Sequence, residues 1–195
     1  MVRREGNPQD LEAFDLRGVT VKRLILLMMA LTLLLAACAG GKPKGDESPP
    51  AARHIVFTGP TAVDQATGLV WMTNANMPGK PLPWKADENV YAFIQGLNRD
   101  NFAGYSDWRL PTREELAGLV EYAKSHGYEP TRMESWPYQQ LRRLGFRDVR
   151  DYGYWSATRN QADSREIWVA DLASGRLMPR PETEVFCVWP VRGGR

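Results

Sequence analysis

Residues 104–116 read Gly104-Tyr105-Ser106-Asp107-Trp108-Arg109-Leu110-Pro111-Thr112-Arg113-Glu114-Glu115-Leu116, and this stretch decides the fold. Thr112 can accept a hydrogen bond from the amide of Glu115, whose side chain can reach back to the amide of Thr112. That reciprocal pair is a capping box, the arrangement that begins a helix. Before it, Asp107 and Arg109 alternate with Trp108, so in an extended chain they share one face and Trp108 takes the other. The stretch therefore predicts an extended segment that leads directly into a helix.

Two helices are predicted from apolar residues that recur every three or four positions. The first covers roughly residues 85–98, and the second begins at the capping box. The positions expected to be buried are Val90, Phe93, Ile94 and Leu97 in the first helix and Leu116, Leu119, Val120 and Ala123 in the second. Residues 128–152 form a long irregular region with one short helix near residues 139–144, and we expect functional variation there.

Strands are predicted on both sides of the helices. In the first hairpin, Asp64 can accept hydrogen bonds from turn amides and Gly68 can take a positive φ. The expected strands are residues 55–57, 69–72, 154–158, 166–172 and 184–192, with a turn at residues 173–175. Hairpins flank the two helices, so the predicted class is α+β with a mostly antiparallel sheet.

The composition indicates one globular domain and no polyanionic partner. The chain has 195 residues, of which 43% are apolar and 10% aromatic, and this is ample for a packed interior. Its 25 Lys and Arg residues are nearly matched by 23 acidic residues. Because no broad basic excess is visible, we expect no nucleic-acid partner.

The N-terminal region has the pattern of an exported, lipid-anchored protein. Lys22 and Arg23 precede an apolar run over residues 24–37 that closes with Leu35-Ala36-Ala37-Cys38. A helix of this length rises about 21 Å, less than the roughly 30 Å of a hydrocarbon core, so a spanning helix is the weaker interpretation. The run resembles a lipoprotein signal peptide with its lipobox, which implies cleavage before Cys38 and lipidation of its sulfur.

Three segments follow from this pattern. Residues 1–37 are an N-terminal extension and signal peptide, residues 38–54 are the lipidated cysteine and a flexible tether, and residues 55–195 are the folded domain. We expect the lipid on Cys38 to hold the domain on a membrane, outside the cytoplasm. By analogy with lipoproteins, Ala39 after the cysteine favours the outer membrane of an organism that has one.

Four strings of residues together resemble the Lcl C-terminal domain family, which is of unknown function and is named for a collagen-like bacterial adhesin. The strings are Asp64-x-x-Thr67-Gly68-Leu69-Val70-Trp71, residues 104–112 with Glu114-Glu115-Leu116, Tyr154-Trp155-Ser156, and Val188-Trp189-Pro190-Val191-Arg192. The resemblance covers about residues 55–195. It implies a fold similar to C-type lectins and to the formylglycine-generating enzyme, with a twisted antiparallel sheet and two helices.

The cysteines argue against an enzyme of the formylglycine-generating type. Such an oxidase needs two thiolates on one copper ion, because soft ligands select Cu(I). Only Cys38 and Cys187 are present, and lipid would consume the first. Many family members carry a cysteine after a tyrosine in the first helix, but here Ala92 follows Tyr91. We therefore interpret Cys187 as an unpaired core residue.

We expect no metal, cofactor or catalytic set elsewhere in the chain. His54 and His126 are the only histidines, and their positions do not predict a shared metal site. Residues 129–131 match the Glu-Pro-Asn calcium and sugar motif of lectins only in part, since Thr131 replaces the asparagine ligand. No Ser-His-Asp set, phosphate loop or CxxC spacing is visible.

The candidate ligand-binding residues are Trp108, Arg109 and Trp136. Flat aromatic rings stack on sugar faces, and Trp84, Trp108 and Trp136 lie outside the predicted strands, so they are better surface candidates than Trp71, Trp155, Trp168 and Trp189. Core packing is nevertheless the more frequent role for each. For Asp107 and Arg109, there are likewise two interpretations. An ion pair or backbone hydrogen bonds that orient the loop are the more frequent role of such a pattern, and a ligand clamp is the less frequent one.

Three functions remain open at this point. The leading hypothesis is a non-enzymatic envelope lipoprotein whose lectin-like domain binds a glycan, a peptide or a partner protein through residues 128–152. The second is a structural or assembly component of an envelope complex, with the domain as a docking face. The third is an enzyme with the formylglycine-generating fold.

Overall fold

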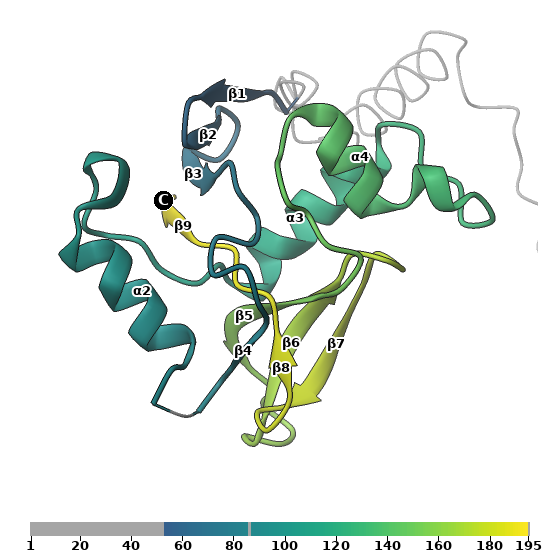
Figure 1. Ribbon diagram of the computed structural model, residues 1–195. Helices are drawn as coiled ribbons and strands as arrows, with labels where there is room; N and C mark the ends of the chain where they lie inside the picture. Colours follow the sequence, from purple (N-terminus) through teal and green to yellow (C-terminus); the bar gives the residue numbers. More distant parts are fainter. Residues whose placement is uncertain (1–52, 86, 195) are drawn as a thin grey trace, which may run out of the picture. The chain divides into compact units, whose positions relative to one another are not determined.

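The structure is a computed structural model, and it describes residues 53–85 and 87–194 (Figure 1). The predicted signal peptide, Cys38 and nearly all of the predicted tether lie outside the described residues. Helices and antiparallel strands make up the described part, which confirms the predicted α+β class. No helix in this part is long and apolar enough to span a membrane.

The elements alternate between short strands and helices along the chain. The strands are β1 (Ile55–Thr58), β2 (Thr61–Asp64), β3 (Leu69–Met72), β4 (Leu82–Pro83), β5 (Gly153–Arg159), β6 (Glu166–Asp171), β7 (Arg176–Pro181), β8 (Val185–Phe186) and β9 (Val191–Gly193). The helices are α2 (Val90–Arg99), α3 (Arg113–Lys124) and α4 (Pro137–Leu144), with 3-10 turns η2 (Phe102–Gly104) and η3 (Met133–Ser135).

The first sheet has the strand order β1-β2-β3-β9, and all its pairs are antiparallel. The turn between β2 and β3 is the predicted one. The Asp64 side chain accepts a hydrogen bond from the Ala66 amide at 3.1 Å, and Gly68 has a φ of 72°. An L side chain resists this φ, so the glycine fixes where the hairpin turns.

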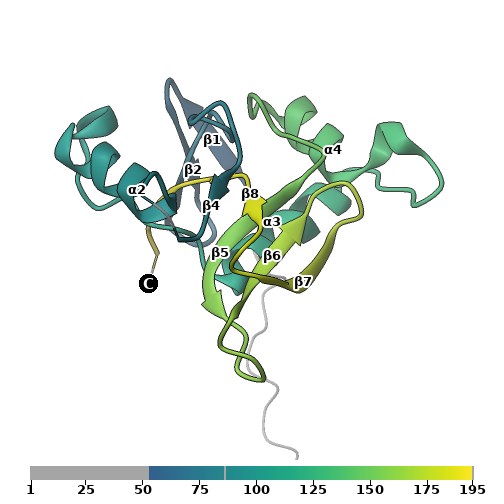
Figure 2. The same ribbon diagram turned by 60° about the horizontal axis from the view of Figure 1, so that its bottom comes forward.

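The remaining strands form the pair β4-β8 and the sheet β5-β6-β7, which Figure 2 shows side by side with β8. The Trp155 amide donates to the Cys187 carbonyl at 3.0 Å, and the Cys187 amide donates to the Gly153 carbonyl at 2.9 Å. These two bonds attach the end of β8 to β5. Helix α3 packs against β5 and β6, and α4 packs against α3.

The prediction of one strand over residues 184–192 is wrong. The chain leaves β8 after Phe186 and enters β9 at Val191, so the two halves serve different sheets. Pro190 has no amide proton to give to a sheet, and it stands where the strand is broken. Trp189 is fully buried at the crossing and donates from Nε1 to the Met72 carbonyl at 2.8 Å.

The helices lie near their predicted positions, except that the first helix begins later than predicted. Helix α2 begins at Val90 and not near residue 85, because the Asn89 side chain accepts from the amides of Tyr91 and Ala92, both at 2.9 Å. The capping box at the start of α3 is confirmed, with both Thr112 and Glu115 in their predicted roles. Helix α4 confirms the short helix expected near residues 139–144.

Large aromatic rings fill the core between the sheets. The Trp189 ring contacts the rings of Trp71 in β3, Tyr154 in β5 and Phe146 in the loop after α4, with centroids 4.9–5.7 Å apart. Trp84 was a surface candidate with core packing as the more frequent role, and it is in fact only 2% exposed and packs on Trp155. The buried tryptophans thus connect segments that lie far apart in the sequence.

Candidate functional site

The 104–112 segment lies between the β1-β2-β3-β9 sheet and the β5-β6-β7 sheet. Arg109 and Val191 exchange both of their backbone hydrogen bonds at 2.9 Å, which places the segment beside β9. Two residues later along the motif, the Pro111 carbonyl accepts from the Ala157 amide in β5 at 2.7 Å. The extended segment is therefore confirmed, and it connects β9 of the first sheet to β5 of the β5-β6-β7 sheet.

The side chain of Arg109 binds other residues of the protein. Its two terminal nitrogens donate to the two carboxylate oxygens of Glu115 at 2.8 and 2.7 Å, and one also donates to the Gly193 carbonyl at 2.8 Å. Burial raises the pKa of Glu115, but the bonds from Arg109 and from the Thr112 amide outweigh it and leave the pKa below its ordinary value. This candidate ligand-binding residue thus orients the segment, as the alternative interpretation expected.

Asp107 pairs with Arg192 and not with Arg109, the residue that would share its face in an extended chain. It accepts two hydrogen bonds from Arg192 at 2.6 and 3.1 Å, and these bonds lower the pKa of Asp107. The Arg192 guanidinium also lies 3.9 Å from the centre of the Tyr105 ring. Asp107 and Arg109 therefore bind two other elements of the fold and do not form the ion pair with each other.

Trp108, a candidate ligand-binding residue, is only 2% exposed, so it has the core-packing role that was expected as the more frequent one. Its Nε1 donates to the Phe102 carbonyl at 3.0 Å, and its backbone exchanges two hydrogen bonds with the Asn98 side chain at 2.7 and 2.9 Å. The indole is thus bound to η2, and the backbone of Trp108 is bound to α2. Burial of this kind leaves no ring face for stacking on a sugar.

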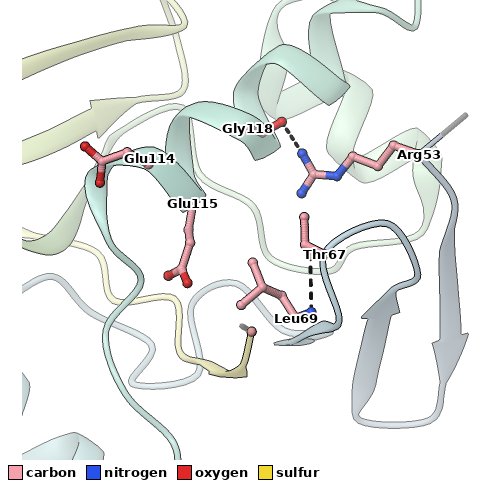
Figure 3. A pocket seen from close by; sticks show the side chains of 7 residues that line it. Arg53, Thr67, Leu69, Glu114, Glu115 and Gly118 are labelled. Atoms are coloured by element: carbon pink, nitrogen blue, oxygen red, sulfur yellow. Dashed lines mark hydrogen bonds between the residues drawn. The ribbon is translucent and has the colours of Figure 1, made fainter. Parts of the chain in front are cut away.

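A pocket of about 240 Å³ opens beside the motif (Figure 3). Its lining residues are Arg53, Thr67, Leu69, Glu114, Glu115, Gly118 and Gly194. Arg53 donates to the buried Asp64 carboxylate at 2.8 Å and to the Gly118 carbonyl, as Figure 3 shows for the latter bond. Glu115 is likewise paired with Arg109, so two of the three charged residues here are already bound within the protein, whereas the exposed Glu114 makes no ion pair with another described residue.

A second pocket, of about 320 Å³, lies between the loop after β3 and the loop before β5. We call it the Tyr152 pocket. It is lined by Asn76, Gly79, Pro81, Arg150, Asp151, Tyr152 and Cys187. The Tyr152 ring is 42% exposed, and its hydroxyl donates to the Val185 carbonyl at 3.3 Å. This pocket therefore offers an aromatic ring that ligands can reach.

Two backbone hydrogen bonds fix the walls of the Tyr152 pocket relative to each other. The Arg147 amide donates to the Thr73 carbonyl, and the Ala75 amide donates to the Arg147 carbonyl, both at 2.8 Å. Asn74 adds a bond from its side chain to the Asp148 carboxylate at 2.8 Å. Asp148 has a φ of 52°, which costs an L residue about 1 kcal/mol and persists only where neighbours hold it. The loop that carries residues 150–152 is thus held in one conformation.

Three side chains of the Tyr152 pocket have polar groups without a partner in the described part of the chain. Arg150 and Asp151 are exposed, and neither side chain makes an ion pair with another described residue. Asn76 is buried, and its Oδ1 accepts no hydrogen bond from the described part of the chain. Burial raises the pKa of the Cys187 thiol to about 11, although the nearby Arg150 charge opposes this. The pocket combines a cation, an anion, a carboxamide and a neutral thiol.

A protein-family model described as the Lcl C-terminal domain matches residues 60–192, well over half of the chain. The chain belongs to the Lcl C-terminal domain family. No curated protein matches it. The match includes the whole 104–112 segment and both loops of the Tyr152 pocket, so the family resemblance stated from the motifs is confirmed.

Trp136, the third candidate residue, lies at the start of α4 in this Lcl C-terminal domain. Its ring is half-buried, contacts Tyr138 with centroids 6.5 Å apart, and donates from Nε1 to the Pro130 carbonyl at 3.3 Å. The structure therefore does not bring Trp136 together with Trp108 or Arg109. The predicted lipidation residue, Cys38, lies outside the described residues.

The two histidines of the Lcl C-terminal domain chain are both exposed and lie on different elements. His126 contacts the Tyr122 carbonyl through Nδ1 at 2.7 Å, beyond the end of α3, and His54 precedes β1. Within residues 53–85 and 87–194, no three His, Cys, Asp or Glu side chains gather in a way that could hold a metal ion. Sequence reasoning missed the Tyr152 pocket, except that it pointed to residues 128–152 as a region for function.

Proposed function

We propose that this protein is a non-enzymatic, lipid-anchored protein of the cell envelope whose Lcl C-terminal domain, with a fold related to C-type lectins, binds a ligand in the Tyr152 pocket. The anchor is supported by Leu35-Ala36-Ala37-Cys38 at the end of an apolar run. Lipid on Cys38 and the tether behind it leave the domain free to meet ligands outside the cytoplasm, with the outer membrane favoured by Ala39.

One observation carries the binding proposal. The Tyr152 pocket presents an exposed ring beside polar groups that have no partners among residues 53–85 and 87–194, on a loop held by backbone bonds to Thr73 and Ala75. Preorganised polar groups around an accessible apolar surface are what ligand sites require, because little ordering is left to do on binding. In contrast, two of the three charged residues that line the pocket beside the motif, Glu115 and Arg53, are paired internally with Arg109 and Asp64.

Binding is tested with the full chain in detergent micelles, using a glycan array and an envelope extract. We expect saturable binding that Tyr152→Ala reduces at least about tenfold, since the ring covers one side of the pocket. Tyr91→Ala is the matched control, because Tyr91 is equally exposed, at 47%, and does not line the pocket. Equal binding by both variants would contradict a ligand site at Tyr152.

The anchor is tested separately. Cys38→Ser should leave the protein uncleaved and without lipid, because the sulfur is the atom that receives the diacylglycerol. Membrane fractionation and intact mass then decide the matter. A Cys38→Ser protein that still fractionates with membranes at the processed mass would contradict lipidation.

A docking role in an envelope complex is the second candidate function. It is favoured by Met77 and Val185, which are 37% and 43% exposed and are close in sequence to pocket residues. A stoichiometric protein partner in the extract, lost in Val185→Asp, would support it. The enzyme hypothesis would need turnover by the purified domain, and a Cys187 thiol with a pKa near 11 is a poor nucleophile.

A further inference from the structure

We infer that the Tyr152 pocket selects a small zwitterion, an amino acid or a free dipeptide, with its carboxylate on Arg150 and its ammonium group on Asp151. This inference rests on the proposed function, and it names the ligand class of the same site. It is carried by two charges of opposite sign and one carboxamide oxygen that have no partner among the described residues, and by the size of the pocket.

The two charges differ from the paired charges around the 104–112 segment and β2. Arg109, Arg192 and Arg53 each bind a carboxylate within 3 Å. Arg150 and Asp151 both line the pocket, yet neither pairs with the other or with any other described residue. A guanidinium and a carboxylate left open on one pocket match a ligand that carries both an anion and a cation.

A neutral sugar fits these charges less well. Any ligand that covers the pocket removes water from Arg150 and Asp151, and this desolvation is costly for ionised groups. A zwitterion offsets the cost with two hydrogen bonds between opposite charges, whereas the hydroxyl groups of a neutral sugar bring no charge of opposite sign. The Tyr152 ring can pack against the aliphatic atoms between the two charged ends of such a ligand.

Asn76 supplies the third contact. It is 5% exposed and lines the pocket, but its Oδ1 has no donor among the described residues. An unsatisfied buried acceptor costs about 1–3 kcal/mol, so a donor brought by a ligand recovers free energy there. The amide N–H of a dipeptide is a donor of this kind, and on this inference it binds Asn76 Oδ1.

The volume limits how large the ligand can be. The pocket holds about 320 Å³, which is at the lower end of the range for small-molecule sites. An amino acid or a dipeptide fills such a space. A longer peptide would have to leave the pocket and would no longer place both of its charged ends on Arg150 and Asp151.

The test is titration calorimetry on the full chain in detergent micelles, with L-alanyl-L-alanine as the probe. The same dipeptide with an acetylated amine, the dipeptide with an amidated carboxyl group, and the neutral disaccharide maltose are the comparison ligands. We expect saturable binding of the free dipeptide, at least about tenfold weaker binding of each blocked form, and no binding of maltose.

Variants then test which residue binds each end of the dipeptide. Arg150→Gln should abolish the preference for a free over an amidated carboxyl group while keeping the preference for a free amine, and Asp151→Asn should do the reverse. Arg143→Gln is the control, because Arg143 is an exposed arginine of α4 outside the pocket. Circular dichroism confirms that each exposed substitution leaves the fold intact.

Three results would overturn the inference. They are no saturable binding of the dipeptide, unchanged preferences in the Arg150 and Asp151 variants, and maltose binding that Tyr152→Ala removes. In each case a Tyr152-dependent signal on the glycan array or with the envelope extract would leave the proposed function standing. Loss of that signal as well would remove the site altogether.

Discussion

Arg109 and Glu115 form a two-pronged ion pair, with nitrogen–oxygen distances of 2.8 and 2.7 Å, that ties the extended 104–112 segment to the first turn of α3. The same Glu115 carboxylate accepts from the Thr112 amide at 2.7 Å and so completes the capping box. One side chain therefore sets both where the helix begins and how the preceding segment approaches it.

Glu115→Gln should separate these two roles. Glutamine can still accept from the Thr112 amide, but it cannot pair with the Arg109 guanidinium. We expect the free energy of unfolding in urea to fall by about 1–2 kcal/mol, since the pair is only partly exposed to water. The control is Asp107→Asn, which breaks the more exposed pair with Arg192 and should cost less than about 1 kcal/mol. A larger loss in Asp107→Asn would contradict this ranking.

Acid should weaken the fold through the same carboxylate. The pKa of Glu115 is lower in the folded protein than its ordinary value of 4.5, despite burial, because Arg109 and the Thr112 amide bind the ionised form. The unfolded chain then binds more protons as the pH falls, so the stabilisation is present above pH 4.5 and is lost as the pH drops through the folded pKa. Urea unfolding at several pH values should show a shallower acid loss for Glu115→Gln, and identical slopes would refute this.

Local signals in the sequence predicted the local features of the fold. The Thr112 and Glu115 pair is three residues apart, and the Asp64 to Gly68 turn spans five, so their chemistry is readable from neighbouring letters. Asp107 and Arg192, however, are 85 positions apart, and no spacing rule connects them. Sequence reasoning therefore found the capping box but could not find the partner of Asp107.

Long-range packing also explains the other errors. The apolar residues around Pro190 favour one strand, but burial of Trp189 between two sheets decides that the chain crosses there. Trp108 lies outside the predicted strands, and only its contacts with Asn98 and Phe102 show that it is buried. The Tyr152 pocket joins two loops about 70 residues apart, so its composition becomes visible only in the folded structure.

Two glycines should respond in opposite ways to alanine. A Cβ at Gly153 in β5 would clash with the Phe186 ring and would lie 2.7 Å from Val169 Cγ1, so Gly153→Ala should destabilise the domain by about 1–3 kcal/mol. A Cβ at Gly96 in α2 meets nothing nearer than the flexible Arg99 side chain at 3.7 Å. Gly96→Ala should therefore raise the free energy of unfolding by about 0.5–1 kcal/mol. Thermal and urea unfolding check both signs, and a stabilising Gly153→Ala would show that the strands adjust freely.

Trp108 should control the strained turn that precedes it. Asn101 and Ala103 have φ values of 50° and 55°, which L residues rarely adopt, and the Phe102 carbonyl between them accepts from the Trp108 indole. Trp108→Phe removes that donor and leaves a gap in the core, so we expect a loss of about 1.5–3 kcal/mol in urea and faster hydrogen exchange over residues 100–105. Trp136→Phe removes a matched but half-buried indole and should change stability by less than about 1 kcal/mol. If exchange in the turn stayed slow in Trp108→Phe, other contacts would have to hold Asn101 and Ala103 in their left-handed conformation.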